Sequence, residues 1–377
     1  MSNRWRRLSL QVSHRLKQVN QRANASLIFT LSRIMTAPRA GERPDWGARP
    51  YKVLYLRYDR IGDMITSTGL IEAIATSHPT ITLDVLASPL NAPVLEQNPH
   101  VGSVLVFDRK RASEFVRVRR ELRQRKYDAV IDCMVTAPST TSLLLMLASG
   151  ARWRVGVGGR TDAFAFTHPV TASKTAIHHI DRASVLATAF GVDGDKHDWR
   201  SKLYISHAER AEAQRRWAAL EAVGSSTSNA RVLVNVSAGH PKRLWPDDRF
   251  VGLLEHIRRR HARTSVVVIA APAERDRGQR IAAAAGARFV ETPTLRLAFT
   301  LMSEADLIVT PDTGLSHAAS ALRIPTVALF TAEKVGLWGL YKTPGRHVVS
   351  RDNTLLSLPV EPVLAAVDEL FDEIRAS

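Results

Sequence analysis

An aspartate that follows a glycine stands where an apolar run turns into a predicted helix. Asp63 lies in the stretch YLRYDRIGDMITSTG, residues 55–69. A carboxylate in the first turn of a helix is near the positive end of the helix dipole, which favours its ionised form, and Gly62 lets another group come close to the backbone. An ionised Asp63 can accept a proton as a general base. This turn alone fits equally well with an aspartate that only caps the helix.

A second turn of this kind lies near the other end of the chain, in ADLIVTPDTGLSHAASALRIPTVALF, residues 305–330. Free amides of residues 313–316, the helix dipole and nearby hydroxyls suit a diphosphate, and Gly314 allows a phosphate to approach the main chain. His317 can add a donor, although a lone histidine on a helix is more often packed or solvated. The residues that we expect at this diphosphate site are Asp312, Thr313, Gly314, Leu315, Ser316 and His317.

Two further turns follow predicted strands in the same half of the chain. SAGHPKRLWPDDRF, residues 237–250, holds Lys242 and Arg243. AAPAERDRGQRIA, residues 270–282, offers Glu274, whose carboxylate can accept hydrogen bonds from a ribose diol. Each turn alone is a weak signal. Their positions at successive strand ends favour a nucleotide-sugar site over a set of unrelated surface turns.

The elements that must position these residues alternate between short apolar runs and amphipathic stretches, which is typical of parallel sheets with crossover helices. In such sheets, ligands bind beyond the carboxyl ends of the strands. Polar segments indicate a domain boundary near 195–230. Strands are predicted at 52–57, 82–87, 103–107, 128–133, 231–237, 264–270, 287–290, 306–310 and 325–330, and helices at 63–76, 112–125, 139–149, 207–222, 247–260, 274–285, 295–303, 315–322 and 360–375.

Length and composition agree with a soluble α/β protein. A chain of 377 residues favours two domains. No apolar run approaches the roughly 18 residues that a membrane-spanning helix needs. With Cys133 as the single cysteine, the chain can form neither an intramolecular disulfide nor a thiolate cluster for zinc. A reducing compartment such as the cytoplasm therefore fits best.

Half of the net charge of +16 lies near the N-terminus, where residues 1–50 hold ten basic residues against two acidic ones. Apolar residues between the cations indicate a basic amphipathic leader. We weigh docking of residues 1–40 on anionic lipid or a lipid-linked acceptor against a disordered extension. A second basic block, 109–126, is typical of the solvated face of a helix, and we expect no nucleic-acid partner because no stacking platform accompanies the charge.

Three ordered motifs carry a family resemblance. The stretch that begins VLYLRYDRIGDMITSTGL, then KRLWP, then DTGLSHAASALRIPTVALF, resembles glycosyltransferase family 9, the ADP-heptose:lipopolysaccharide heptosyltransferases and their relatives. The resemblance covers about residues 51–375. It implies a GT-B fold, in which two Rossmann-like α/β domains face each other across a cleft. We expect a leader over 1–50, an acceptor domain over 51–205, a nucleotide-sugar domain over 206–359, and a C-terminal helix over 360–377 that packs back on the N-terminal domain.

The resemblance also implies roles for single residues. The family's catalytic base falls on Asp63, its diphosphate-binding turn on residues 312–317, and its ribose-binding acid on Glu274. The family usually has a lysine two residues before its Trp-Pro pair, whereas this chain has Arg243 there and Lys242 one position earlier, so either cation can contact the phosphates. Sugar transfer is implied to invert the anomeric carbon without a metal ion, with cationic residues and helix amides stabilising the leaving group.

We expect no cofactor, and a nucleotide sugar such as ADP-heptose as the donor substrate. The expected acceptor is a glycan or glycolipid. We expect the enzyme to be cytoplasmic and held peripherally at the inner face of the cytoplasmic membrane. Alternatives are a GT-B enzyme that uses a UDP-sugar or GDP-sugar, an epimerase of similar architecture, and a non-enzymatic binder of anionic lipid or nucleic acid. The single D-x-D sequence, residues 193–195, lies in the predicted linker and indicates a turn, so we predict no metal site there.

Overall fold

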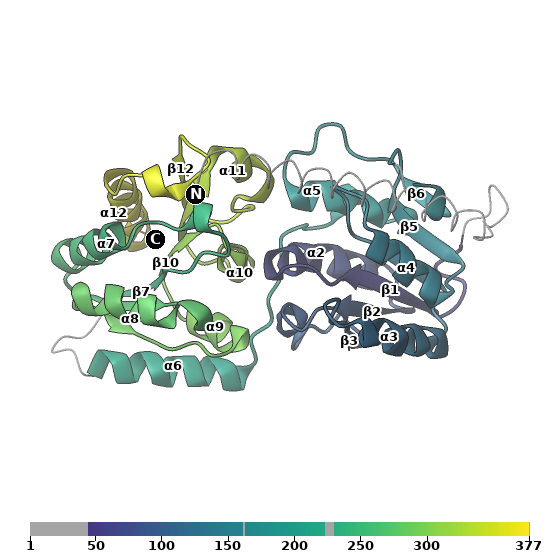
Figure 1. Cartoon of the computed structure of the whole chain (residues 1–377), viewed down its shortest axis with the longest axis horizontal. Coiled ribbons are helices and arrows are strands. Elements are labelled where there is room, and N and C mark those ends of the chain that lie inside the picture. Colours follow the sequence, from purple (N-terminus) through teal and green to yellow (C-terminus); the bar gives the residue numbers. More distant parts are fainter. Residues whose placement is uncertain (1–43, 161–162, 223–229, 377) are drawn as a thin grey trace, which may run out of the picture.

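The computed structural model describes residues 44–160, 163–222 and 230–376, which form two parallel sheets flanked by helices (Figure 1). The strand order is β3-β2-β1-β4-β5-β6 in the N-terminal sheet and β12-β11-β10-β7-β8-β9 in the C-terminal sheet. Both halves therefore have the expected Rossmann-like order. The strands are β1 (Tyr51–Arg57), β2 (Ile81–Ala87), β3 (Val104–Val106), β4 (Ala129–Asp132), β5 (Trp153–Val157), β6 (His168–Val170), β7 (Ala230–Asn235), β8 (Thr264–Ile269), β9 (Arg288–Phe289), β10 (Leu307–Pro311), β11 (Thr326–Thr331) and β12 (Gly345–Ser350).

Helices follow most strands and return the chain to the end of the sheet at which the next parallel strand begins. The nine helices that the sequence predicts are present, and α5 and α11 are two short ones that it does not predict. The helix predicted from residue 63 begins two residues earlier, at Ile61. The helices are α2 (Ile61–Ser77), α3 (Ala112–Arg125), α4 (Thr140–Ser149), α5 (His179–Ser184), α6 (His207–Ala222), α7 (Asp247–Arg260), α8 (Arg275–Ala284), α9 (Leu295–Met302), α10 (Gly314–Leu322), α11 (Ala332–Trp338) and α12 (Glu361–Ala376).

Three strands, β5, β6 and β12, are not predicted by the sequence. β5 contains Arg154 and Gly156, and β6 is three residues long with a central proline. β12 forms an edge of its sheet and is partly exposed. Strands near an edge have less apolar surface to bury, so their sequences lack the continuous apolar run of a central parallel strand.

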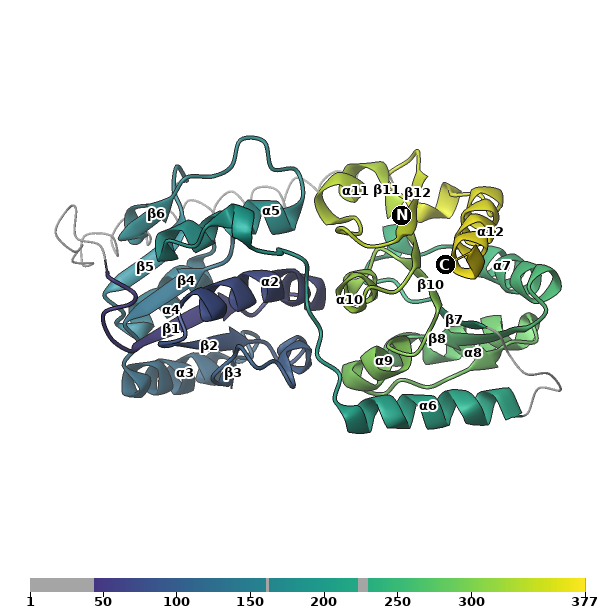
Figure 2. The same ribbon diagram turned by 180° about the vertical axis from the view of Figure 1, so that it is seen from behind.

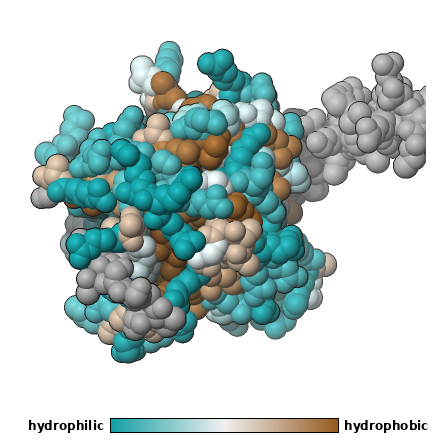
Figure 3. Space-filling model, turned by 90° about the vertical axis from the view of Figure 1, so that its left-hand side faces the viewer, coloured by the Kyte–Doolittle hydropathy of each residue, from teal (hydrophilic) through white to brown (hydrophobic). Residues whose placement is uncertain are grey.

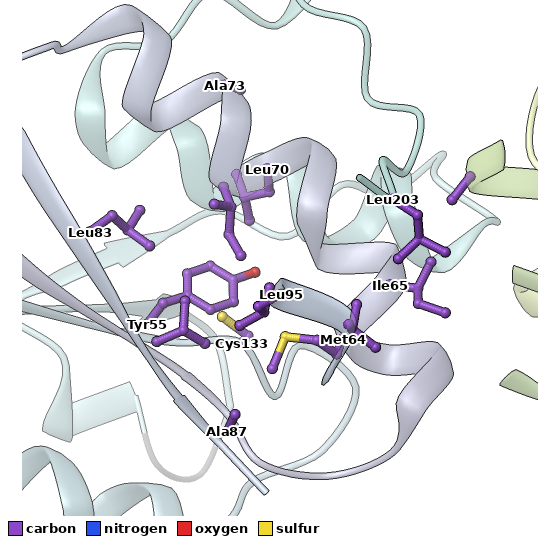
Figure 4. Close-up of a cluster of buried hydrophobic side chains, with 14 of the residues drawn as sticks. Tyr55, Met64, Ile65, Leu70, Ala73, Leu83, Ala87, Leu95, Cys133 and Leu203 are labelled. Carbon is purple, nitrogen blue, oxygen red and sulfur yellow. The ribbon is translucent and has the colours of Figure 1, made fainter. Parts of the chain in front are cut away.

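Helix α2 is buried on almost every side, which fixes the place of the residues at its start. Met64 and Leu70 lie near Tyr55 of β1 and Cys133, which follows β4, and Ile65 lies beside Leu203 in the same cluster (Figure 4). On other sides α2 contacts α5 and α10. A helix that is apolar around most of its circumference is typically enclosed by other elements. The first turn of α2 is therefore held rigidly against the N-terminal sheet.

The two domains meet where the carboxyl ends of β1 and β10 lead into α2 and α10 (Figure 1). A Cβ atom added to Gly62 would lie 2.6 Å from Cδ2 of His317, and one added to Gly314 would lie 2.8 Å from Cγ2 of Ile61. Real Cβ atoms do not approach other atoms so closely. The two glycines thus allow the starts of α2 and α10 to touch across the domain interface.

The C-terminal helix does not pack on the N-terminal domain, so that expectation was wrong. α12 lies against β11, β12 and α7 of the C-terminal domain (Figure 2). Its apolar stripe, which includes Val363, Val367 and Phe371, is buried in the core of that domain, and the ring of His261 stacks on Phe371 at 4.0 Å. The surface of the C-terminal domain that faces away from the N-terminal domain is largely hydrophilic, with hydrophobic residues gathered in its middle (Figure 3).

The chain crosses once from the first domain to the second just before α6 (Figure 2). α6 already packs on the C-terminal domain, because Trp217 donates a hydrogen bond from Nε1 to the carbonyl of Leu301 at 3.1 Å. The leader predicted over 1–50 lies mostly outside the described residues, which begin at Pro44. Within the described ranges, the structure has no helix that is both long and apolar enough to span a membrane.

Candidate active site

Asp63 is the third residue of α2 and not its N-cap. The N-cap is Arg60, whose side chain makes no capping hydrogen bond. The Asp63 carboxylate is 15% exposed, and its Oδ1 lies 3.7 Å from Nη2 of Arg57. Asp63 therefore does not occupy the N-cap position that the capping alternative assumed, although a hydrogen bond from the backbone of the N-cap residue Arg60 helps to lower the pKa of its carboxylate. The side chain stands at the domain interface, where a substrate hydroxyl can meet it.

Burial raises the pKa of Asp63 above its usual value, and the neighbouring Asp59 carboxylate raises that pKa further. The cations Arg57 and Arg60 oppose both effects. A general base works best when its pKa lies near the working pH, so a raised carboxylate pKa favours proton abstraction. The surroundings of Asp63 therefore suit a base better than those of an exposed aspartate.

The start of α10 is only partly free to bind an anion. Thr313 is the N-cap, and its hydroxyl accepts a hydrogen bond from the Leu315 amide at 3.2 Å. The Thr313 carbonyl accepts the Ser316 amide at 3.2 Å and the Ser316 hydroxyl at 2.8 Å. Two of the four amides expected to be free thus have partners in this structure. Gly314, the first residue of α10, lies against Ile61 at the domain interface, and the dipole of α10 favours a negative charge at that end of the helix.

His317 is a buried, neutral residue of α10 that packs against the other domain. Burial, helped by the nearby His178 and Arg243, lowers the pKa of His317 to about 3. Its ring contacts the Gly62 position and lies edge-on to Trp338, with ring centroids 5.9 Å apart. A neutral imidazole keeps one N–H that can donate to an anion. His317 is therefore placed at the contact between α2 and α10.

The two candidate phosphate cations differ in their surroundings. Arg243 lies in the short helix η5 (Pro241–Arg243) and donates from Nη1 to the Asp312 carbonyl at 3.0 Å, with Asp312 Oδ2 at 3.3 Å. Burial raises the pKa of Asp312, and Arg243 opposes that shift. Lys242 is exposed. The structure thus holds Arg243 against the turn before α10 and leaves Lys242 at the surface.

Glu274 ties the turn after β8 to the turn after β7. It is the last residue of η6 (Pro272–Glu274), and its Oε2 accepts the Ala238 amide at 3.1 Å. Asn235, at the end of β7, donates from Nδ2 to the hydroxyls of Thr310 at 2.9 Å and Thr313 at 3.3 Å. The three turns of the C-terminal domain that the sequence singles out are thus connected at one end of the sheet.

Arg60 links the two halves of the site electrostatically. It lowers the pKa of Asp63 in its own domain and the pKa of Asp312 in the other domain. Its side chain is exposed. A cation whose charge acts on acidic residues of both domains suits a site that receives the negative charge of a diphosphate.

Several residues at the site are not predicted from the sequence. Arg57 is 1% exposed and lies beside Asp63, and His179 is 2% exposed and contacts Arg57. Trp338, a residue of the C-terminal domain, stacks on His179, and the two ring centroids are 4.2 Å apart. A charged residue at the end of an otherwise apolar strand is the signal that marks Arg57. The pairing of His179 with Trp338 has no local sequence signal, because it depends on how the domains meet.

Two other motif residues have structural roles. Trp245 of KRLWP is fully buried and donates from Nε1 to the Leu358 carbonyl at 2.8 Å. In the D-x-D sequence, the Asp193 side chain accepts the Asp195 amide at 3.2 Å and caps a turn, as predicted. Among the residues that the structure describes, no three His, Cys, Asp or Glu side chains form a group suited to a metal ion.

Comparisons with known proteins agree with this architecture. Residues 115–357 match the model of glycosyltransferase family 9 (heptosyltransferase). Lipopolysaccharide heptosyltransferase 3 of Escherichia coli (strain K12) is 25% identical over 349 residues, which cover 83% of this chain and 96% of that relative. The match therefore extends over nearly the whole length of the relative.

Solved structures show the same fold. The crystal structure of a family 9 glycosyl transferase from Veillonella parvula DSM 2008 superposes with a TM-score of 0.76 at 17% identity, covering 88% of this chain and 99% of that one. The structure of ADP-heptose lps heptosyltransferase II from E. coli superposes with a TM-score of 0.69 at 21% identity, covering 85% and 99%. Because the family model matches well over half of the chain, this protein belongs to glycosyltransferase family 9 and is a glycosyltransferase with the GT-B fold.

Proposed function

We propose that this enzyme transfers a heptose from ADP-heptose to a hydroxyl of a glycan or glycolipid acceptor in lipopolysaccharide synthesis, with Asp63 as general base. The observation that carries the proposal is the contact between the starts of α2 and α10. That contact sets a partly buried carboxylate beside the helix start that suits a diphosphate. A sugar bound between them would have its acceptor on one side and its leaving group on the other.

The reaction is a single displacement. Asp63 takes the proton of the acceptor hydroxyl as that oxygen attacks the anomeric carbon from the face opposite the diphosphate. The new glycosidic bond forms while the bond between the anomeric carbon and the phosphate oxygen breaks, so the configuration inverts. Arg243 and the α10 amides stabilise the charge that develops on the departing nucleoside diphosphate.

The nucleotide is proposed from the names of relatives, which include an ADP-heptose heptosyltransferase, and UDP or GDP is the alternative. Thermal shifts with ADP, UDP and GDP, followed by product analysis with the matching nucleotide sugars, test the choice. We expect ADP to raise the melting temperature most, because a ligand that binds only the native state stabilises it by mass action. A larger shift with UDP or GDP, and transfer from that sugar, would replace ADP-heptose as the donor.

Transfer should not need a divalent cation. We expect full activity after dialysis against EDTA, because Arg243 and helix amides can take the part that a bound metal plays at a diphosphate. The measurement is the initial rate before and after chelation, with added Mg²⁺ as a control. A complete loss that Mg²⁺ restores would refute this account of leaving-group stabilisation.

The basic leader is the part of the chain that we propose binds the membrane, where a glycolipid acceptor would lie. Most of the leader lies outside the described residues. Each Lys or Arg near an anionic surface contributes about 1 kcal/mol, and seven cations precede residue 35. We propose that the leader holds a cytoplasmic enzyme at the inner face of the cytoplasmic membrane. Deleting residues 1–40 should leave ADP binding intact and reduce co-sedimentation with anionic liposomes, and salt should weaken binding of the full chain. Equal, negligible binding by both forms would contradict the proposal.

A further inference from the structure

Arg57 is a fully buried cation at the end of β1, and its guanidinium contacts polar groups from several elements. Nε donates to the carbonyl of Asp63 at 3.0 Å. Nη1 donates to the Cys133 carbonyl at 3.0 Å and to Oδ2 of Asp59 at 3.4 Å. Nη2 lies 2.7 Å from Nε2 of His179 and 3.7 Å from Oδ1 of Asp63. A buried charge needs such partners to be stable, and here they surround the candidate base.

The backbone of Asp63 is fixed from three directions. Its carbonyl accepts hydrogen bonds from Nε of Arg57 at 3.0 Å, from the hydroxyl of Thr66 at 3.0 Å and from the hydroxyl of Ser67 at 2.9 Å. The same guanidinium that holds the carbonyl also lies beside the carboxylate of this residue. Arg57 therefore determines both where Asp63 stands and what charge it faces.

His179, the first residue of α5, contacts the Arg57 guanidinium through its Nε2 atom at 2.7 Å. Because a guanidinium only donates, Nε2 of His179 must accept, so the ring is neutral with its proton on Nδ1. Burial, together with Arg57, lowers the pKa of His179 to about 2, in agreement with a neutral ring. The ring of Trp338 stacks on the His179 ring, with ring centroids 4.2 Å apart. A residue of the C-terminal domain thus completes the packing around the group that holds Arg57.

We propose that Arg57 is a positioning residue for transfer, which aims the Asp63 carboxylate and keeps it ionised, and that His179 and Trp338 fix Arg57 when the domains meet. The inference rests on the proposed role of Asp63 as the base. It goes beyond that role because it names the groups that prepare the base, one of which comes from the opposite domain. A base held this way needs no reorganisation when the acceptor hydroxyl arrives.

The charges that face Asp63 make the inference testable through pH. From its own loop come Arg57, Asp59 and Arg60. On the elements packed against this loop the two histidines are neutral, because burial lowers the pKa of His179 to about 2 and that of His317 to about 3. The charged side chains on these elements are Asp132, Asp181 and Arg182 in the same domain, and Arg243 and Asp312 in the other. Burial also raises the pKa of the Cys133 thiol far above neutrality. The charges that act on the Asp63 carboxylate itself are those of Arg57, Asp59 and Arg60, so replacing Arg57 or Asp59 should move the acidic limb of the pH profile.

The experiment compares the pH dependence of kcat/KM for the full-length wild type, Arg57→Gln, Arg57→Lys and Asp59→Asn. The base must be ionised, so activity is lost as pH falls through the pKa of Asp63. Removing the Arg57 charge raises that pKa, and we expect the acidic limb of Arg57→Gln to move up by about one pH unit or more. Asp59→Asn removes a neighbouring negative charge, so its limb should move to lower pH.

Arg57→Lys separates charge from geometry. It keeps the positive charge but loses the planar fork, so its limb should stay near that of the wild type while kcat falls by about 10-fold or more. KM for the donor should not change, because the donor site is assigned to the other domain. A residue that only supports the fold would lower stability without moving the limb.

The outcomes separate this inference from the assignment of the base. If Asp63→Asn is inactive, but the limbs of Arg57→Gln and Asp59→Asn coincide with that of the wild type, the role of Arg57 is overturned and the base stands. If Asp63→Asn keeps near wild-type turnover, the base assignment fails first. Should Arg57→Gln not fold, as judged by circular dichroism and ADP binding, an unshifted limb in Asp59→Asn still overturns the inference.

Discussion

Asp63→Asn is expected to fold and to bind ADP like the wild type, while its turnover falls by about 100-fold or more. Asparagine nearly matches aspartate in shape, so the hydrogen bonds to the residue 63 carbonyl from Arg57, Thr66 and Ser67 can persist. It cannot accept the proton of the acceptor hydroxyl. The measurements are kcat with saturating donor and acceptor, and ADP affinity by calorimetry.

The matched control is Asp193→Asn. This aspartate caps an exposed turn and forms an ion pair with Lys196 at 3.1 Å, so the same chemical change there should leave kcat close to the wild-type value. It also removes one carboxylate of the single D-x-D sequence. Near wild-type turnover in Asp63→Asn, with the fold intact, would show that another group takes the proton.

The central strands and their helices could be predicted from the sequence. Central parallel strands are buried on both faces, so each has a continuous apolar run that marks it. β1, β7 and β10 are central in their sheets, and each leads directly to a motif residue or turn. The edge strand β12 and the short β6 carry no such run. Position at the edge of a sheet is a property of the assembled fold, and a local pattern reports it weakly.

The candidate site could be predicted in its motifs but not in its cross-domain contacts. The sequence predicts that Gly314 lets a phosphate approach the main chain, and the structure adds a contact of this glycine with Ile61 of the other domain. The prediction that α12 packs on the N-terminal domain is wrong for a similar reason. The sequence shows that α12 has an apolar stripe but does not show which domain the stripe contacts. Arg57 lies within the first motif, but only the structure shows the five groups around its guanidinium.

The second large effect is expected on kcat/KM for the donor when the cation that contacts the diphosphate, either Lys242 or Arg243, is replaced. We expect Arg243→Met to lower kcat/KM for the donor by about 100-fold, the order found when one donor to a developing negative charge is removed. Arg243 is held at the turn before α10 by Asp312, with Nη1 at 3.0 Å from its carbonyl. The measurement is kcat/KM at fixed acceptor concentration, together with ADP affinity.

Lys242→Met is the matched control, since it removes one positive charge at the neighbouring, exposed position and should change kcat/KM by no more than a few-fold. Arg243→Met also removes the ion pair between Arg243 and Asp312, so a melting curve must accompany the kinetics. Arg243→Lys restores a charge near Asp312 without the planar fork, and we expect it to recover part of the lost rate. If Lys242→Met instead carries the large loss while Arg243→Met affects only the melting temperature, Arg243 is a structural partner of Asp312. The flexible lysine would then be the group that moves onto the diphosphate when the donor binds.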